Sequence, residues 1–104
     1  MAERRDTKRI PFRTKIKLGK DKAELIARTF NISELGIGIE SRRIYPPGSK
    51  IVINIEDGSK SNKVSGKVTW AHSNLPGLPS RMGVRINETD INVIKEVYRK
   101  KSGK

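Results

Sequence analysis

The sequence contains no cysteine, so the chain can form no disulfide, no thiolate zinc site and no cysteine nucleophile. This absence fits a reducing compartment, and we expect a cytoplasmic protein. No apolar run approaches the length of about 18 residues that a membrane span needs, and the first residues show no apolar stretch typical of a signal peptide. We therefore expect no membrane segment.

Residues able to carry out catalysis are also scarce. The chain has one histidine, His72, and a lone histidine is more often a surface or packing residue than a catalytic base. It has no Walker phosphate-binding loop, no HExxH zinc motif and no GxSxG nucleophile motif. The acidic residues are scattered, with no pair placed for acid–base work. We expect no enzyme, no catalytic residue, no metal and no cofactor.

Positive charge is abundant by contrast. The 104 residues include 23 Lys and Arg against 11 Asp and Glu, a net charge of +12, and the excess lies mainly within residues 1–22 and 99–104. Such a concentration predicts an anionic partner: nucleic acid, a phosphate-bearing ligand, an acidic membrane surface or an acidic protein. The C-terminal lysines either join in this binding or only solubilise the chain end. Arg4, Arg5 and Arg9 lead the N-terminal cluster, and their planar forks suit bidentate phosphate or guanine contacts.

Length and aliphatic composition predict one small, mainly β domain. Of the 24 Ile, Val and Leu residues, 19 are β-branched, which favours strands. Six segments alternate apolar with polar residues. They are 12–18, 23–30, 37–40, 50–56, 63–70 and 81–86. In the fifth segment, Val64, Gly66, Val68 and Trp70 are predicted to share one face.

The end of the chain changes period and predicts a helix over 88–101. Apolar residues from Ile91 to Tyr98 form a stripe at helical spacing, and Asn87 or Thr89 can cap its start. Strands followed by one helix predict an all-β fold, a six-stranded antiparallel barrel that the C-terminal α-helix plugs or flanks. No repeat or linker interrupts residues 1–104, so we expect a single domain.

Two short motifs stand out as candidates for binding. Arg5 and Arg9 form an R-x-x-x-R pattern directly preceded by Arg4, and residues 31–36 form an N-x-S-x-x-G pattern between two predicted strands. Either motif alone is weak. The first arises readily by chance in a chain this basic, and the second describes any Asx turn with a glycine exit. Both motifs together, in this order, indicate a binding site more strongly than either motif alone.

These motifs resemble the signature of the PilZ domain family, bacterial receptors for cyclic di-GMP. That signature places R-x-x-x-R just before the first strand and (D/N)-x-S-x-x-G between the second and third strands, as Arg5/Arg9 and Asn31/Ser33/Gly36 do here.

The resemblance extends over essentially the whole chain. Gly38 follows the turn, residues 68–70 resemble the family's V-x-W strand, and residues 82–86 resemble its G-V-x-F strand. Two departures are mild. Asn31 stands where Asp is commoner, which could alter hydrogen bonding to a guanine edge, and Ile86 replaces an aromatic residue in a packing position.

The resemblance implies a ligand that fits these residue types. Cyclic di-GMP carries two phosphodiester charges and two guanines, which arginine forks at Arg5 and Arg9 can contact. Asn31 and Ser33 lie on a turn from which short side chains can reach a base or phosphate edge. Gly36 is expected to let the backbone turn sharply and to admit the ligand.

Further candidates lie outside the two motifs. They are Gly38, Trp70, Arg81 and Arg85. For Trp70, packing in the core or at the barrel rim is favoured over stacking on the ligand. Arg4 either stacks on a second ligand molecule, giving a stacked dimer of cyclic di-GMP, or is one more solvated charge.

The resemblance also implies an organisation and a function. A single PilZ-like domain spans 1–104, with a mobile arm at 1–12, the barrel at 13–87 and the helix at 88–101. The arm folds over the ligand, and the resulting conformational change signals to a downstream protein. Motility, surface polysaccharide or biofilm control are the expected outputs.

Two alternatives remain open. The first is a small basic barrel that binds RNA or single-stranded DNA, which the charge supports. Aromatic residues, at 5% of the chain, leave few rings for the stacking platforms of such proteins. The second is a PilZ-like module with an idle ligand site, against which the intact motifs argue.

Overall fold

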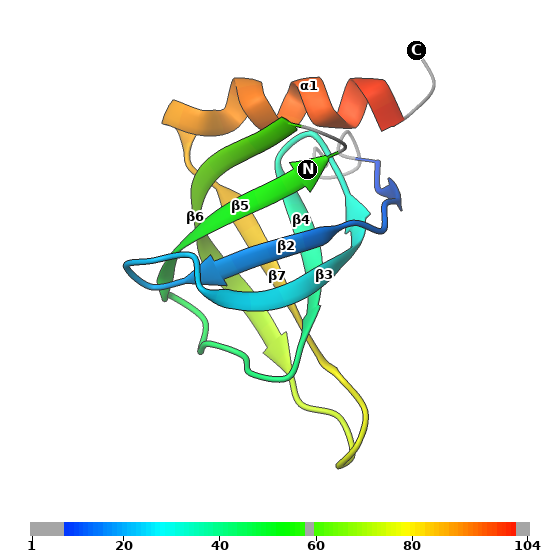
Figure 1. Ribbon diagram of the computed structural model, residues 1–104, viewed down its shortest axis with the longest axis vertical. Coiled ribbons are helices and arrows are strands. Elements are labelled where there is room, and N and C mark those ends of the chain that lie inside the picture. Colours follow the sequence, from blue (N-terminus) through cyan, green and yellow to red (C-terminus); the bar gives the residue numbers. More distant parts are fainter. Residues whose placement is uncertain (1–7, 58–59, 102–104) are drawn as a thin grey trace, which may run out of the picture.

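The computed structural model describes residues 8–57 and 60–101. These residues form seven strands, a short 3-10 helix and one α-helix (Figure 1). The elements are β1 (Ile10–Pro11), β2 (Lys15–Gly19), β3 (Leu25–Ile32), β4 (Gly36–Ser41), β5 (Lys50–Asp57), β6 (Lys60–His72), β7 (Ser80–Ile86), η2 (Glu88–Asp90) and α1 (Ile91–Lys101).

The strands form one closed antiparallel barrel. Their order is β1-β3-β2-β5-β6-β7-β4, and an additional pairing of β3 with β4 joins the ends of the sheet. Closure removes the exposed edges that an open sheet would present. The predicted six-stranded barrel with a C-terminal helix is confirmed, with β1 as an extra two-residue strand beside β3.

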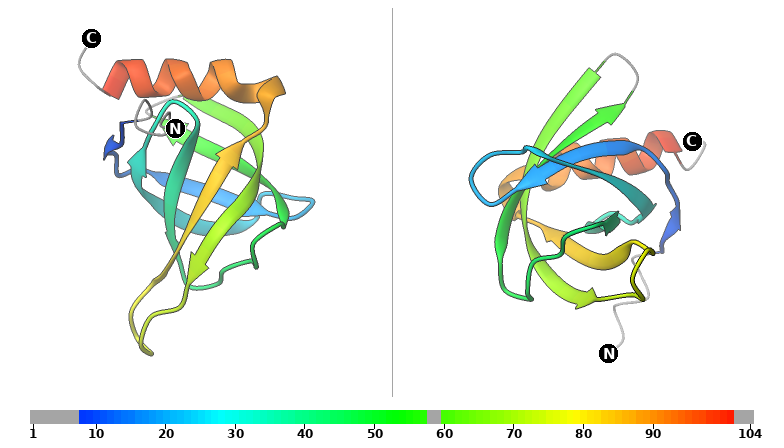
Figure 2. Two further views of the ribbon diagram at one scale, coloured as in Figure 1. Left: turned by 180° about the vertical axis from the view of Figure 1, so that it is seen from behind. Right: turned by 60° about the horizontal axis from the view of Figure 1, so that its bottom comes forward.

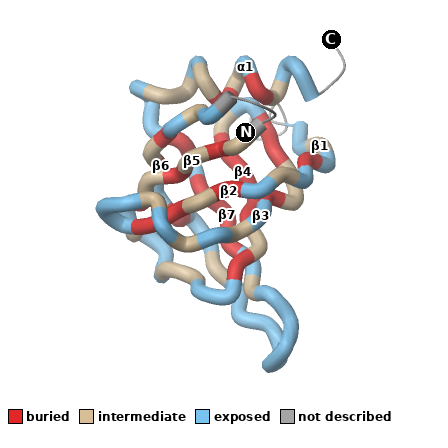
Figure 3. The backbone as a smooth tube through the Cα atoms, viewed as in Figure 1, coloured by how far each residue is buried: buried red, intermediate tan, exposed pale blue. Residues whose placement is uncertain are grey.

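The residues of the core are the apolar ones that alternate with polar residues along the strands. Inward positions of β5 and β7, such as Ile53 and Val84, are almost fully buried, whereas most outward residues of β5 are half-buried and Arg81 and Arg85 on β7 are exposed (Figure 3). Helix α1 lies across one end of the barrel (Figure 2) and buries Ile94 and Val97 there. The barrel is therefore filled by branched aliphatic side chains and covered at one mouth by the helix.

The start of the helical segment is held by β6. Asp90 Oδ2 accepts a hydrogen bond from the Ser65 N–H (2.8 Å), and the Asn87 N–H donates to the Ser65 carbonyl oxygen (2.9 Å). Asn87 precedes η2 but makes no side-chain capping bond. Contact with the sheet, rather than the predicted cap, positions this end of the helix.

The N-terminal strands begin differently from the prediction over 12–18. Pro11 lacks an N–H and ends the short strand β1. Phe12 is buried, and its carbonyl oxygen accepts a hydrogen bond from the Thr29 hydroxyl (2.6 Å). The Thr14 N–H donates to Thr29 Oγ1 (3.0 Å), so a side chain supplements the backbone hydrogen bonds by which residues 12–14 join β3 before β2 begins at Lys15.

A register shift in β6 changes the orientation of Trp70. Val68 pairs with Val84, but Trp70 pairs with Gly83, so the extra residue between them forms a bulge. Val68 is buried, whereas Trp70 is 41% exposed. The prediction that Trp70 shares a face with Val68 is wrong, because the bulge turns the indole to the outer surface.

Candidate functional site

One residue of each motif meets the other on the outer surface of the barrel. Arg9 Nη1 donates a hydrogen bond to Asn31 Oδ1 (3.0 Å), across 22 residues of sequence. The pairing of β1 with the end of β3, Pro11 opposite Asn31, brings the two side chains together. Arg4 and Arg5 lie outside the described residues, so the described part of the R-x-x-x-R motif is Arg9.

Ser33 shapes the turn between β3 and β4. Its hydroxyl oxygen accepts hydrogen bonds from the N–H groups of Leu35 (3.3 Å) and Gly36 (3.2 Å), and its own N–H donates to the Gly36 carbonyl oxygen (2.8 Å). The residue is buried. In this structure the Ser33 hydroxyl therefore satisfies backbone donors of the turn instead of facing solvent, where we expected it to reach a ligand.

Gly36 is required for a reason that the sequence did not show. The glycines with positive φ among the described residues are Gly48 and Gly77, so the sharp turn does not depend on a left-handed conformation at Gly36. A Cβ atom at Gly36 would instead overlap the carbonyl oxygen of Val84 on β7. Glycine allows β4 and β7 to approach closely at the turn.

Two aromatic rings lie across paired glycines beside this turn. Gly38 on β4 pairs with Gly83 on β7. A Cβ at Gly38 would meet the Phe30 ring and Asn31 Oδ1, and one at Gly83 would meet the Trp70 indole. These five residues, which we call the glycine platform, lie together beside Arg9, which contacts Asn31.

The two rings differ in what covers them. The Arg81 guanidinium lies 4.4 Å from the centre of the Phe30 ring, and Glu40 Oε2 accepts hydrogen bonds from Arg81 Nε (3.1 Å) and Nη2 (2.8 Å). Arg81 is therefore neutralised and fixed over Phe30. Among the described residues no cation lies over Trp70, which is 41% exposed and so presents part of its indole to solvent, where a planar base can stack.

Arg85 supplies a cation on the same strand as Gly83. It is exposed and pairs with Gly36 in the register of β4 and β7. Within residues 8–57 and 60–101, no acidic side chain pairs with Arg85. The site thus combines the Arg85 guanidinium, which no acidic side chain of the described segments pairs, with the Arg9–Asn31 contact and the partly exposed indole of Trp70.

Phe30 and Gly83 belong to this surface, and we did not select them from the sequence as binding residues. The pattern that marks this surface is an aromatic residue on one strand beside a glycine on the neighbouring strand, and it occurs twice. It can be recognised only when the strand register is known, because cross-strand partners are distant in sequence.

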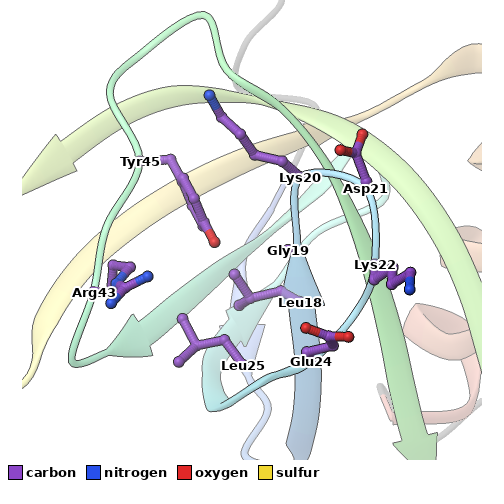
Figure 4. Close-up of a pocket in the computed structure, with 9 residues that line it drawn as sticks. All are labelled: Leu18, Gly19, Lys20, Asp21, Lys22, Glu24, Leu25, Arg43 and Tyr45. Carbon is purple, nitrogen blue, oxygen red and sulfur yellow. The ribbon is translucent and has the colours of Figure 1, made fainter.

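A separate hollow lies at the β2–β3 turn (Figure 4) and contains none of the candidate residues. Leu18 and Leu25 lie beneath Tyr45 of the β4–β5 loop, and the volume is about 490 Å³. The charged residues around it carry both signs. They are Lys20, Asp21, Lys22, Glu24 and Arg43. This mixture is less suited to a doubly negative ligand than the platform is.

The described residues offer no support for catalysis by a metal. No group of three or more His, Asp or Glu residues in this part of the chain is placed to hold a metal ion. His72 is exposed and lies opposite Arg81 in the β6–β7 register. Nor does any helix in the described segments combine the length and apolarity needed to cross a membrane.

The fold is shared with two structures whose identities are low enough that the likeness shows the fold alone. The Bacillus subtilis inhibitor of motility (MotI/DgrA) matches with a TM-score of 0.71 at 14% identity, over 99% of this chain. This chain spans about half, 54%, of that protein. The PilZ domain of YcgR from Escherichia coli, solved with c-di-GMP, matches with a TM-score of 0.69 at 16% identity, over 91% of this chain and 88% of that one.

No curated protein matches the chain in sequence. A family model does match, and it covers nearly the entire length. The model of the PilZ domain aligns with residues 3–100, and PilZ domains are non-catalytic receptors for cyclic di-GMP. The chain belongs to the PilZ domain family.

Proposed function

We propose that this chain binds cyclic di-GMP at the glycine platform and acts as a receptor that signals to a downstream protein. The observation that carries the proposal is the hydrogen bond from Arg9 to Asn31, because it joins the two motifs at one place on the barrel. Family membership and the structure of the YcgR PilZ domain with c-di-GMP support the choice of ligand.

The residues supply the contacts that such a ligand needs. The guanidinium forks of Arg5 and Arg9 contact the phosphates or the guanine O6 and N7 atoms. Asn31 offers both an acceptor and donors to a guanine edge. Trp70 provides a stacking surface, and Arg85 adds positive charge. Ser33 and Gly36 act through the shape of the turn, as their buried contacts indicate.

Binding orders the N-terminal arm in this proposal. The Arg9–Asn31 bond is exposed, so a ligand exchanges it for stronger contacts to charged phosphate at little cost. Residues before β1 then close over the ligand, and the altered surface carries the signal. In this proposal the chain is divided as the sequence predicts, with the arm at 1–12, the barrel at 13–87 and the helix at 88–101.

The output proposed is control of motility, surface polysaccharide or biofilm, exerted in the cytoplasm. Of these three outputs, control of motility is supported by the fold shared with the Bacillus subtilis inhibitor of motility.

The ligand test is a thermal-shift titration with cyclic di-GMP, GTP and a short RNA at two salt concentrations. A ligand held by a specific site raises the melting temperature at low concentration, following its Kd. We expect this for cyclic di-GMP at both salt concentrations, with little response to GTP. No shift with cyclic di-GMP would refute the proposal.

Arg4 is proposed to set the stoichiometry. A guanidinium beside the first motif arginine can stack on a second ligand molecule, which gives a stacked dimer of cyclic di-GMP. Isothermal titration should then show two ligands per chain for the natural sequence and one for Arg4→Ala. One ligand per chain in both proteins would assign Arg4 to the solvated surface.

The alternative of RNA or single-stranded DNA binding has less support. All five aromatic residues lie in the described segments, and among them Trp70 alone is exposed. Proteins that bind single strands stack several bases on successive rings. One open ring is a poor platform for that purpose.

A further inference from the structure

The loop between β6 and β7 exposes leucines at the tip of the molecule. Residues 73–79 extend beyond the barrel at the end opposite α1 (Figure 1). Leu75 is 72% exposed and Leu78 is 57% exposed, although large aliphatic side chains usually lie in the core. Two adjacent exposed leucines on a projecting loop form an apolar knob.

This knob is held in one conformation. The Leu78 N–H donates to the Leu75 carbonyl oxygen (3.0 Å), Pro76 takes the second position and Gly77, with φ of 92°, takes the third. These features define a type II turn. At its base, Asn74 Nδ2 donates to the Pro79 carbonyl oxygen (2.7 Å). The leucines are thus pre-positioned, which lowers the entropy lost when a partner covers them.

Shallow hollows flank the knob. One of about 510 Å³ is lined by the loop itself and Arg42. Another, of about 380 Å³, lies between Pro79 and the outer face of β3, where Ile26 is 60% exposed. Pro79 and Arg42 line both hollows, so the leucines and Ile26 belong to neighbouring hollows that share one boundary.

The rim of this region is positively charged. Arg28 and Arg42 line the second hollow. Within residues 8–57 and 60–101, neither is paired with an acidic side chain. Glu40 also lines the hollow, but its charge is already paired with Arg81, which donates two hydrogen bonds to Glu40 Oε2. The excess charge favours an occupant with carboxylates.

We propose that this region, the Leu75/Leu78 knob with Ile26, Arg28 and Arg42, docks an acidic protein segment that carries apolar side chains. The apolar side chains of the segment cover the exposed aliphatic residues, and its carboxylates pair with the two arginines. The proposal goes beyond ligand binding, since the surface lies beyond the Glu40–Arg81 pair from the glycine platform.

Two other occupants fit less well. A second copy of the chain brings the same arginines and a net charge of +12, so the copies repel each other. An anionic membrane would accept the leucines but would leave the concave hollows unfilled. An acidic protein segment can fill the hollows with its apolar side chains and pair its carboxylates with the two arginines.

The test uses peptides selected from a random display library against the full chain without cyclic di-GMP. We expect the selected peptides to be rich in Asp, Glu and large apolar residues. Their footprint in two-dimensional amide NMR spectra should include residues 74–80, Ile26, Arg28 and Arg42. The double variant Leu75→Ser/Leu78→Ser and the variant Arg42→Glu should each weaken a selected peptide by about tenfold or more.

Lys100→Glu is the matched control, because it makes the same charge change on α1 at the other end of the molecule and should leave peptide affinity unchanged. Equal losses in Arg42→Glu and Lys100→Glu would overturn the proposal, since net charge alone would then explain binding. A peptide footprint away from the loop would also overturn it. So would loop-dependent binding to phosphatidylserine vesicles in the absence of any selected peptide.

Failure of this proposal is distinguishable from failure of ligand binding. The double leucine variant keeps every residue of the glycine platform, so its affinity for cyclic di-GMP should equal that of the natural chain. The peptide measurements need no cyclic di-GMP, and a chain that binds peptides at the loop but not the dinucleotide would refute only the receptor function.

Discussion

The two polar residues of the N-x-S-x-x-G motif make different contacts in the protein without ligand. Ser33 satisfies the backbone of the β3–β4 turn, whereas Asn31 holds the guanidinium of Arg9 on the surface. One residue is buried and structural, and the other is accessible and exchangeable. Substitutions at the two positions should therefore have separable effects on stability and on binding.

Removing a motif arginine should weaken ligand binding and leave the fold intact. We expect Arg5→Ala or Arg9→Ala to lower the affinity for cyclic di-GMP by about 1–3 kcal/mol, the value of a charge-assisted contact. Isothermal titration measures the loss. Arg13→Ala, an exposed arginine outside the motif, is the control. Unchanged binding in both motif variants would show that these arginines do not hold the ligand.

Gly36→Ala should destabilise the barrel. The new Cβ overlaps the Val84 carbonyl oxygen, and because that atom belongs to the backbone, β4 and β7 must separate. Overpacking of this kind costs about 1–3 kcal/mol in the free energy of unfolding. Urea denaturation measures it, with the exposed Glu34→Ala in the same turn as control. Equal stability of the two variants would contradict the close approach.

Between the elements, one buried hydroxyl reinforces the backbone hydrogen bonds that join residues 12–14 to β3. Thr29 on β3 donates to the Phe12 carbonyl oxygen and accepts from the Thr14 N–H. At the other face of Phe12, Lys101 Nζ of α1 lies 5.7 Å from the ring centre. These contacts and the β1–β3 pairing hold residues 10–14 against β3, so the closure proposed for the arm is confined to residues before β1.

Thr29→Val should loosen this junction. The valine keeps the shape but leaves the Phe12 carbonyl and the Thr14 N–H without their partner, which costs about 1–3 kcal/mol of unfolding free energy. Thr29→Ser retains the hydroxyl and is the control. Faster hydrogen exchange at the Thr14 amide in the valine variant, but not in the serine variant, would locate the effect. Indistinguishable unfolding curves for valine and the natural chain would refute the role of the hydroxyl.

For the whole molecule, the net charge of +12 makes weak attraction to any polyanion inevitable. Specific recognition must therefore be separated from this background. The arrangement of the molecule helps, because the glycine platform and the leucine knob each bring particular charged and apolar side chains together, which net charge alone does not provide.

Salt dependence should separate the two kinds of binding. Between about 50 and 200 mM salt, we expect the Kd for cyclic di-GMP to rise by about tenfold at most, because the ligand carries two charges, and the Kd for RNA to rise by several orders of magnitude. Fluorescence anisotropy with labelled ligands provides both values. Parallel loss of the two affinities would indicate that cyclic di-GMP is held by general electrostatics only.

Much of the fold could be predicted because alternation is a local property. When β-branched residues occupy every second position, a β-strand places all of them on one face, which can then be buried. The predicted segments 50–56 and 81–86 accordingly match β5 and β7 closely. The period change after Asn87 likewise predicted the final helix. The family resemblance of the two motifs led us to expect them at one place, and of the first motif the structure describes Arg9, which lies beside Asn31.

Other features depended on contacts between distant residues, and only the tertiary structure decided them. The bulge that exposes Trp70 reflects the fit of β6 to β7, and the need for glycine at residue 36 comes from the Val84 carbonyl 48 positions later. Ser33 became buried through the closure of its turn. Residue type and spacing determine what a segment can form, whereas exposure, close approach and the pairing of charges arise only when the strands close into a barrel.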